Sequence, residues 1–264
     1  MAKKNETALD LRVDDIMLEK QRMIGSKMNF AAAEAYKLLR TNITFSFPGG
    51  EAHHIVGVTS SMRGEGKSLT SMNTAYSLAE TGRDVLLIEG DMRIPTMANR
   101  LGLAATPGLS NLMVGLNSVR NAIQPYHVIL DDGKELSFDV MVSGDVPPNP
   151  SELLESDRFA GLLEKLRERY DYIVLDLPPV TAVTDAVIAS RLVDGMLMVV
   201  REGFAHRSAL NEAMRQLKLA GARIIGFVYN GVKEKSGGYY KRGYYKNSYY
   251  AQNEQQSEER GLPD

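Results

Sequence analysis

The run of residues 57–68, Gly-Val-Thr-Ser-Ser-Met-Arg-Gly-Glu-Gly-Lys-Ser, constrains the fold of this chain more than any other stretch. It begins within an apolar segment, residues 55–58, that predicts a buried strand, and apolar residues at helical spacing follow it up to Gly82. A strand, a glycine-containing loop and a helix that opens with Gly-Lys-Ser are the setting of a phosphate-binding P-loop. Backbone amides of such a loop point at phosphate oxygens, and the helix N-terminus adds a favourable dipole. The sequence therefore predicts that the chain binds a nucleotide.

Within this loop, Lys67 is expected to reach the β- and γ-phosphates, and the Ser68 hydroxyl is expected to bind Mg²⁺. The usual pattern opens with glycine, and Ser61 occupies that position here. The alternative is a chance Gly-Lys-Ser in an ordinary strand–helix turn, and the flanking elements favour the P-loop. The residues predicted to contact the nucleotide are Ser61, Arg63, Gly64, Glu65, Gly66, Lys67, Ser68 and Leu69.

Composition sets the class of protein. The 264 residues, of which 44% are apolar, are enough for one large α/β domain or two small ones. A net charge of −2 implies no general attraction to nucleic acid or to an anionic membrane. The absence of cysteine excludes disulfides and thiolate metal sites, and no run approaches the ~18 apolar residues of a membrane span. We therefore expect a cytoplasmic protein that works at a membrane only through a partner.

Two further strands are predicted to end in carboxylates. Residues 84–88 lead into Glu89-Gly90-Asp91, and residues 172–175 lead into Asp176. Carboxylates at the carboxyl ends of parallel strands project into the crevice where open α/β sheets bind their ligands. Four apolar residues followed by Asp have the Walker B form, whose carboxylate holds Mg²⁺ or its bound water.

The rest of the chain alternates helices and strands. We expect helices at 30–43, 150–166 and 208–220, strands at 136–142, 196–200 and 224–229, and short helices and loops over 96–135. This alternation predicts one doubly wound, mostly parallel sheet flanked by helices, an α/β fold of the P-loop NTPase kind. Three segments are expected: an N-terminal arm or docking segment (1–28), the P-loop domain (29–235) and a flexible tyrosine-rich tail (236–264).

The tail concentrates tyrosine. Six of the twelve tyrosines of the chain lie within residues 239–250, after a flexible Ser236-Gly237-Gly238 hinge. Aromatic residues among basic ones could stack on single-stranded nucleic acid, or the hydroxyls could accept phosphate. The P-loop favours the second interpretation, and we expect no nucleic-acid partner. The predicted acceptors are Tyr239, Tyr240, Tyr244, Tyr245, Tyr249 and Tyr250.

The predicted helix at 30–43 carries Glu34, Lys37 and Arg40, each three residues after the last. These side chains fall on neighbouring positions of the helix surface. The pattern fits a charged helix face exposed to solvent, and it also fits a contact between subunits. From periodicity alone, the solvent-exposed face is favoured.

Taken together, these motifs resemble those of a bacterial tyrosine kinase (BY-kinase) of the capsule and exopolysaccharide type, within the MinD/ParA-like P-loop superfamily. The family's Walker A, Walker A′ and Walker B motifs correspond to residues 61–68, 86–93 and 173–176. Residues 34–42 are similar to the family's oligomerisation helix, and the Pro-Pro-Asn-Pro run and the tyrosine cluster are also typical. MinD/ParA-type ATPases carry an additional lysine at the position of Met62 and lack the tyrosine cluster.

The resemblance implies an ATP- and Mg²⁺-dependent protein-tyrosine kinase that phosphorylates its own tail. Asp91 would orient the attacking phenol and accept its proton, and Arg93 would order this loop or balance its carboxylates. Asn230 matches a residue that contacts adenine in the superfamily, with Arg201 as a second candidate. The implied catalytic residues are Lys67, Glu89, Asp91 and Asp176, and the implied metal-binding residues are Ser68, Asp91 and Asp176.

The resemblance also implies partners. It predicts a homo-oligomeric ring with Glu34, Lys37 and Arg40 at the interface, a membrane adaptor that recruits and activates the kinase at the inner face of the membrane, and a tyrosine phosphatase that resets it. The pathway served would be capsule or exopolysaccharide synthesis or export. Glu89 replaces the usual Asp, and Lys37 replaces the usual Arg. The alternative function is a P-loop ATPase switch of the MinD/ParA type whose tyrosines another kinase modifies.

Overall fold

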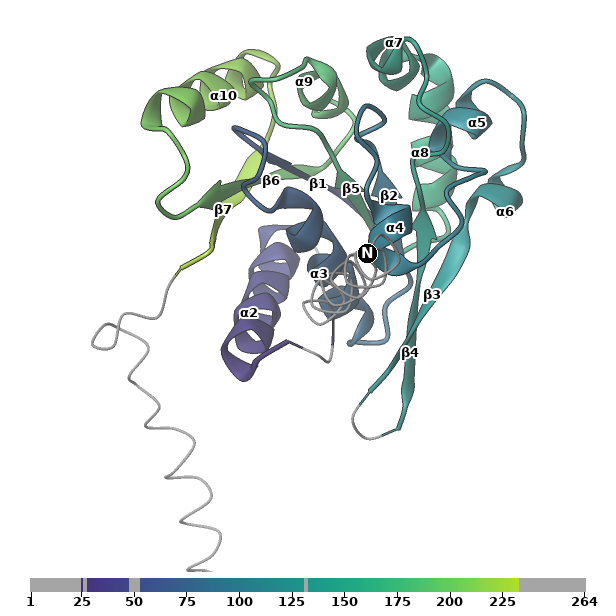
Figure 1. Cartoon of the computed structure of the whole chain (residues 1–264), viewed down its shortest axis with the longest axis horizontal. Coiled ribbons are helices and arrows are strands. Elements are labelled where there is room, and N and C mark those ends of the chain that lie inside the picture. Colours follow the sequence, from purple (N-terminus) through teal and green to yellow (C-terminus); the bar gives the residue numbers. More distant parts are fainter. Residues whose placement is uncertain (1–24, 26–27, 48–52, 131–132, 233–264) are drawn as a thin grey trace, which may run out of the picture. The chain divides into compact units, whose positions relative to one another are not determined.

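The computed structural model describes residues 25, 28–47, 53–130 and 133–232 (Figure 1). The chain divides into two units, Met1–Asn230 and Gly231–Asp264, and the fold belongs to the first. Apart from residues 25 and 28, the predicted N-terminal arm lies outside the described residues, as does the predicted tail with its six tyrosines.

A single sheet runs through the first unit. Its strand order is β3-β4-β2-β5-β1-β6-β7, and every neighbouring pair is parallel except the antiparallel pair β3–β4. The strands are β1 (His54–Ser60), β2 (Val85–Glu89), β3 (Gln124–Ile129), β4 (Glu135–Met141), β5 (Tyr172–Asp176), β6 (Gly195–Arg201) and β7 (Ile224–Asn230). This arrangement confirms the predicted doubly wound, mostly parallel sheet.

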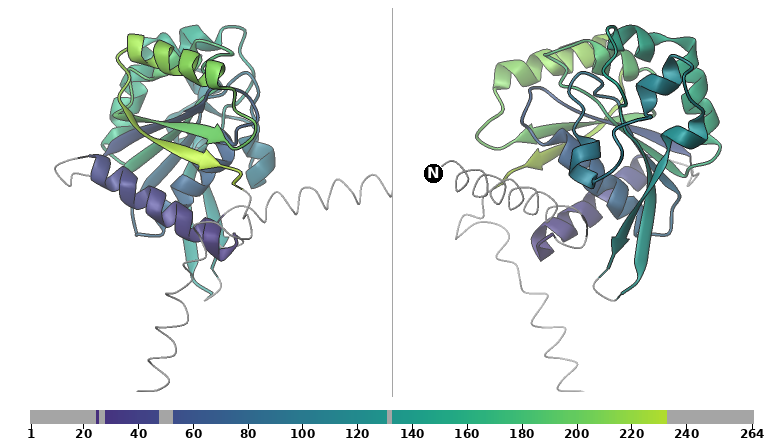
Figure 2. Two further views of the ribbon diagram at one scale, coloured as in Figure 1. Left: turned by 90° about the vertical axis from the view of Figure 1, so that its left-hand side faces the viewer. Right: turned by 45° about the vertical axis from the view of Figure 1, so that its right-hand side comes forward.

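Helices cover both faces of the sheet (Figure 2). α2 and α3 lie on one face with α4, and α8, α9 and α10 lie on the other with α5, α6 and α7. Alternate residues of β5 show the division, because Ile173 and Leu175 pack in one core and Val174 packs in the other. The helices are α2 (Phe30–Ser46), α3 (Lys67–Ala79), α4 (Met97–Leu101), α5 (Leu109–Met113), α6 (Val119–Ala122), α7 (Pro150–Glu155), α8 (Asp157–Arg167), α9 (Asp185–Ala189) and α10 (Arg207–Leu219).

Most predicted elements are confirmed, and two expectations are wrong. The predicted single helix at 150–166 is two helices, because Ser156 has an extended backbone (φ −70°, ψ 145°) and its hydroxyl caps α8 by accepting from the Phe159 amide at 3.2 Å. β3 lies where short helices and loops were expected. Its burial alternates along an edge strand that contains Pro125 and His127, so it lacks the apolar run of the central strands.

The register of the central strands positions the site. Asp176 lies level with Val58 of β1 on one side and with Glu89 of β2 on the other. The loops that follow β1, β2 and β5 therefore open at the same edge of the sheet, which is the edge where ligands bind in such folds.

Candidate active site

The P-loop connects β1 to α3 and needs glycine at two positions. Gly64 has φ +84° and Gly66 has φ +96°, a left-handed conformation that other residues adopt only with strain. A Cβ on Gly66 would also overlap the side-chain amide of Asn230, which donates to the Glu65 carbonyl at 2.8 Å. α3 begins directly after Gly66, so its N-terminal amides follow the loop, as in anion-binding P-loops.

The replaced first glycine, Ser61, has a structural explanation. Its hydroxyl donates to Glu65 Oε2 at 2.9 Å, and the Met62 amide donates to the same oxygen at 2.7 Å. On the other side, the Thr181 hydroxyl donates to the Ser61 carbonyl at 2.6 Å. Ser61 and Glu65 are both fully buried. The Glu65 side chain therefore braces the loop from within, although the sequence grouped it with the nucleotide contacts.

Lys67, the first residue of α3, lies between two carboxylates. Its Nζ is 3.0 Å from Asp91 Oδ2 and 3.8 Å from Asp176 Oδ2, and the Ser68 hydroxyl is 3.3 Å away. Burial lowers the pKa of Lys67, but Asp176 and Asp91 outweigh that effect and the net pKa is raised. Lys67 is therefore a firmly charged ammonium at the carboxyl edge of the sheet.

Asp176 is fully buried at the end of β5. Its Oδ1 accepts from the Ser71 hydroxyl at 3.0 Å, whereas among the described residues Oδ2 has no hydrogen-bond donor and has only the distant ammonium of Lys67. Burial raises the pKa of this carboxyl, while Lys67 and the hydroxyls of Ser68 and Ser71 lower it to a smaller extent. A buried oxygen without a donor is suited to bind a cation.

Glu89 is engaged differently from Asp91, although both follow β2. Its Oε1 accepts the backbone amides of Thr96 (2.5 Å) and Met97 (2.8 Å), and its Oε2 accepts the amide of Ser143 (3.0 Å). Burial raises the pKa of Glu89, and these three amides oppose that shift. With both oxygens taken by the main chain, Glu89 holds loops together. Its predicted catalytic role gains no support from this geometry.

Arg93 fixes the same loop at a second point, between Glu89 and Thr96. Its guanidinium contacts Asp185 on α9 and Ser151 on α7, two residues that the sequence did not single out. Ser151 directly follows the Pro-Pro-Asn-Pro run, and Asp185 stands in none of the motifs named above; only the fold shows that they meet Arg93, which lies 58 and 92 positions away.

Two more side chains, those of Arg201 and Phe204, border the P-loop. Arg201 Nη1 donates to the Gly64 carbonyl at 3.0 Å, and its guanidinium lies 5.4 Å from the centre of the Phe204 ring. A Cβ on Gly64 would be only 3.4 Å from that ring, so Phe204 flanks the loop as well. Of the remaining predicted contacts, Arg63 is exposed, and Leu69, which lies on α3, packs partly into the core.

The predicted oligomerisation residues lie on α2 and diverge. Glu34 Oε1 and Lys37 Nζ form a 2.8 Å ion pair in which both side chains are about half exposed. Arg40 instead turns toward α3, where it donates to the Ser77 carbonyl at 2.5 Å and contacts Glu80 at 3.1 Å. Glu34 and Arg40 are six residues apart, so at ~3.6 residues per turn their side chains point in directions about 120° apart around the helix axis.

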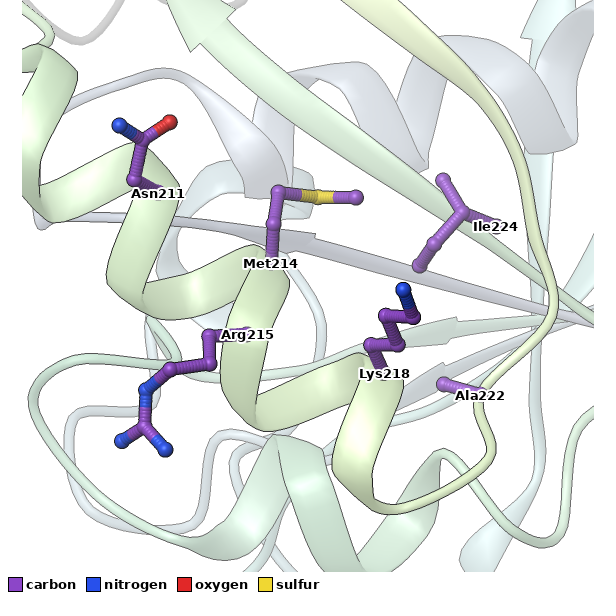
Figure 3. A pocket seen from close by; sticks show the side chains of 6 residues that line it. All are labelled: Asn211, Met214, Arg215, Lys218, Ala222 and Ile224. Atoms are coloured by element: carbon purple, nitrogen blue, oxygen red, sulfur yellow. The ribbon is translucent and has the colours of Figure 1, made fainter.

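Two other features of the described chain lie outside this site. A pocket of about 490 Å³ lies beside α10, and no predicted site residue lines it; its walls, labelled in Figure 3, are Asn211, Met214, Arg215, Lys218, Ala222 and Ile224. In the part of the chain that the structure describes, every helix is too short or too polar to span a membrane.

Known proteins share this arrangement. A family model for ParA, described as NUBPL iron-transfer P-loop NTPase, matches residues 51–234. Tyrosine-protein kinase YwqD of Bacillus subtilis is 34% identical over 211 residues, which cover 79% of this chain and 86% of YwqD. The chain belongs to the bacterial tyrosine-protein kinases. The resemblance in the motifs is thereby confirmed, within the wider group of ParA-like P-loop NTPases.

Solved kinase structures have the same fold. The kinase domain of the Escherichia coli tyrosine kinase ETK is 35% identical to this kinase with a TM-score of 0.70, and the match covers 79% of each chain. The chimerical protein CapA2B2 is 30% identical with a TM-score of 0.66, over 75% of this chain and 84% of the chimera. The P-loop and the carboxyl-edge acids of this chain thus belong to a kinase domain.

Proposed function

We propose that this kinase transfers the γ-phosphoryl group of ATP to the tyrosines of its own segment 239–250. The convergence of Lys67, Asp91 and Asp176 beside the P-loop is the observation that carries the proposal. Membership of the tyrosine-protein kinases supplies the reaction class, and the tyrosine cluster supplies acceptors on the same chain.

The P-loop amides and Lys67 would bind the phosphates. Lys67 now pairs with Asp91 and Asp176, and a triphosphate beside Gly66 offers the ammonium a stronger anionic partner. Asn230 and Arg201 would flank the nucleoside, because both already contact the backbone of the loop.

Mg²⁺ fits the same residues. Asp176 Oδ2 is buried without a hydrogen-bond donor among the described residues, and the Ser68 hydroxyl lies beside Lys67. In the described chain no three His, Cys, Asp or Glu side chains form a metal cluster, which suits an ion held by one or two carboxylates plus phosphate oxygens. Ser68 and Asp176 would hold the ion, with Asp91 as a further ligand. When bound, the ion would neutralise charge on the phosphates.

Asp91 would act on the acceptor. As the bond from the γ-phosphorus to the ADP oxygen breaks and the bond to the phenol oxygen forms, the phenol proton passes to the Asp91 carboxylate. The pKa of free tyrosine is about 10, so this proton leaves late, as transfer proceeds. Tethering supplies a high local concentration of acceptor.

Assembly would bring one chain's tail to a neighbour's site. Phe30, Leu38 and Phe45 expose 65%, 60% and 81% of their surface on α2, next to Glu34 and Lys37. Exposed apolar side chains on one helix favour a contact between copies. We place Glu34 and Lys37 in that contact of a ring, while Arg40 anchors the helix to α3 from behind.

Partners complete the proposal. A membrane adaptor would recruit and activate the kinase at the inner face of the membrane, and a tyrosine phosphatase would reset it. The chimerical protein CapA2B2 supports the adaptor, because a chimera joins parts of different proteins, and this one contains a part that resembles this kinase. The pathway would be capsule or exopolysaccharide synthesis.

Labelled ATP tests the proposal. Purified protein incubated with γ-labelled ATP and Mg²⁺ should incorporate label within residues 239–250, and Lys67→Met should remove it. Lys67→Arg is the matched control, because it keeps the charge and should retain part of the label. Free phosphate without labelled protein would instead indicate an ATPase switch modified by another kinase.

A further inference from the structure

Two buried carboxylates hold the loop that carries Asp91, one where the loop begins and ends and one near its middle. Glu89, at the end of β2, accepts hydrogen bonds from the amides of Thr96 and Met97, where the loop ends. Asp185 accepts hydrogen bonds from Arg93, in the middle of the loop. Asp91 lies between these two attachments. Its position therefore depends on both.

Asp185 is an unusual partner for a loop residue because it is completely buried. It is the first residue of α9, and both of its oxygens face the Arg93 guanidinium, with Nε–Oδ2 at 2.9 Å and Nη2–Oδ1 at 3.0 Å. Two parallel charge-assisted hydrogen bonds fix the orientation of the planar guanidinium as well as its distance. Asp185 is buried while the Arg93 side chain is 38% exposed, so the arginine reaches from the surface to a fixed carboxylate.

Ser151 joins a third segment to the pair. Its hydroxyl donates to Asp185 Oδ1 at 2.7 Å and accepts from Arg93 Nη2 at 2.9 Å. The first turn of α7, the start of α9 and the loop after β2 are thus tied at one point.

Arg93 lies two residues after Asp91, so fixing Arg93 also restricts the backbone around Asp91. The amide of Ile94, next to Arg93, donates to Asp91 Oδ1 at 3.3 Å, and Lys67 Nζ contacts Oδ2 at 3.0 Å. A guanidinium fixed by Asp185 therefore fixes the backbone from which the Asp91 carboxylate is oriented. These side-chain hydrogen bonds of Asp185 join it to Arg93 and Ser151, outside the P-loop.

We propose that Asp185 is a positioning residue for phosphoryl transfer, which through Arg93 holds the Asp91 carboxylate where the acceptor phenol arrives. The inference rests on the proposed function, because it needs Asp91 to act on the acceptor. Asp185 would affect the transfer step and leave nucleotide binding alone.

Asp185→Asn in the full chain tests this, because the substitution keeps the shape and removes the charge. We expect kcat for labelling of the tail to fall about 100-fold, as a displacement of about 1 Å in a catalytic group does, while KM for ATP stays within about threefold of wild type. The loss should vanish in an Asp91→Asn background, since a positioning residue has nothing left to position. Ser151→Ala, which removes two hydrogen bonds at a partly exposed helix start, should show the same kcat-only pattern at about tenfold or less.

The matched control is Asp194→Asn. Asp194 also pairs with an arginine, Arg167 Nη1 at 2.8 Å, and accepts a backbone amide, that of Ile55, but at the opposite edge of the sheet. It should lower the melting temperature and leave kcat unchanged.

Three outcomes would overturn the inference. They are an Asp185→Asn kcat no lower than that of Asp194→Asn, a rise in KM for ATP that accounts for the loss, and an equal loss with Asp91→Asn already present. If Asp185→Asn does not fold, wild-type kcat in Ser151→Ala overturns it. If Asp91→Asn alone labels the tail normally, the proposed function itself fails, which separates the two results.

Discussion

Two groups of carboxylates at the carboxyl edge of the sheet behave in opposite ways. Glu89 and Asp185, the anchoring carboxylates, have every oxygen occupied by donors of the protein: three backbone amides for one, Arg93 and Ser151 for the other. Asp91 and Asp176, the facing carboxylates, share the ammonium of Lys67; Asp91 also accepts from the Ile94 amide, and Asp176 also accepts from the Ser71 hydroxyl. All four are buried, so burial does not separate the two groups.

The difference lies in the donor that the facing carboxylates share, because Lys67 is a side chain that a bound triphosphate can attract, whereas Glu89 is held by three backbone amides. Burial raises the pKa of both Glu89 and Asp176; three backbone amides oppose that shift at Glu89, whereas Asp176 Oδ2 has no hydrogen-bond donor among the described residues. A group that the fold leaves incompletely paired is one that a ligand can complete. The anchoring carboxylates therefore organise the loops, and the facing carboxylates are the candidates for chemistry.

The largest expected effect comes from comparing Asp91→Asn with Glu89→Gln, two residues apart in one loop. Asp91→Asn should reduce tail labelling by about 10²–10⁴-fold, the usual contribution of a general base, with little change in melting temperature. Glu89→Gln should do the reverse, because a side-chain amide nitrogen must then face a backbone amide. We expect it to destabilise the fold by about 1–3 kcal/mol while the folded fraction keeps most of its kcat.

Labelling and thermal melts on the same preparations check both variants. Equal losses of kcat in the two variants would erase the distinction between anchoring and facing carboxylates. Glu89 would then have the catalytic role that its sequence position suggested.

The sequence predicted one of these groups and could not predict the other. Lys67, Asp91 and Asp176 follow strands that apolar runs reveal, and the parallel sheet then brings strand ends together. The partners of Glu89 are main-chain amides as far away as Ser143, and Asp185 is paired over 92 positions, so no local pattern reports them. The same holds for Ser61, whose hydroxyl replaces a glycine because Glu65 turns inward to meet it. β3 was missed because an edge strand needs only a weak apolar pattern.

A smaller effect concerns stability against pH. Burial places the pKa of Asp176 above the 3.8 of the unfolded chain, so between those two values the folded state binds more protons. Stability of the nucleotide-free protein should therefore fall as the pH rises through this window. Asp176→Asn cannot ionise, so it should flatten that fall and raise the melting temperature at pH 7, by about 2–4 °C for each 1 kcal/mol gained.

Melting curves of the nucleotide-free protein between pH 4 and 8 measure this effect. Asp157→Asn, at an exposed position in the first turn of α8, is the control and should keep the wild-type profile. A lower melting temperature for Asp176→Asn at pH 7 would mean that the pairing with Lys67 outweighs burial. Asp176 would then belong with the anchoring carboxylates.

The smallest expected effect comes from Ser71, one turn after Lys67 on α3. Its hydroxyl orients Asp176 by donating to Oδ1 at 3.0 Å, which leaves Oδ2 directed at the proposed cation. Ser71→Ala should raise the Mg²⁺ concentration for half-maximal labelling by about tenfold, as loss of a ligand's hydrogen-bond partner does, with kcat at saturating Mg²⁺ retained. Ser77→Ala removes a buried hydroxyl from the same helix, on its contact with α2, and should leave the Mg²⁺ requirement unchanged. If Ser71→Ala also leaves it unchanged, Lys67 alone orients Asp176, and the free oxygen is no sign of a cation site.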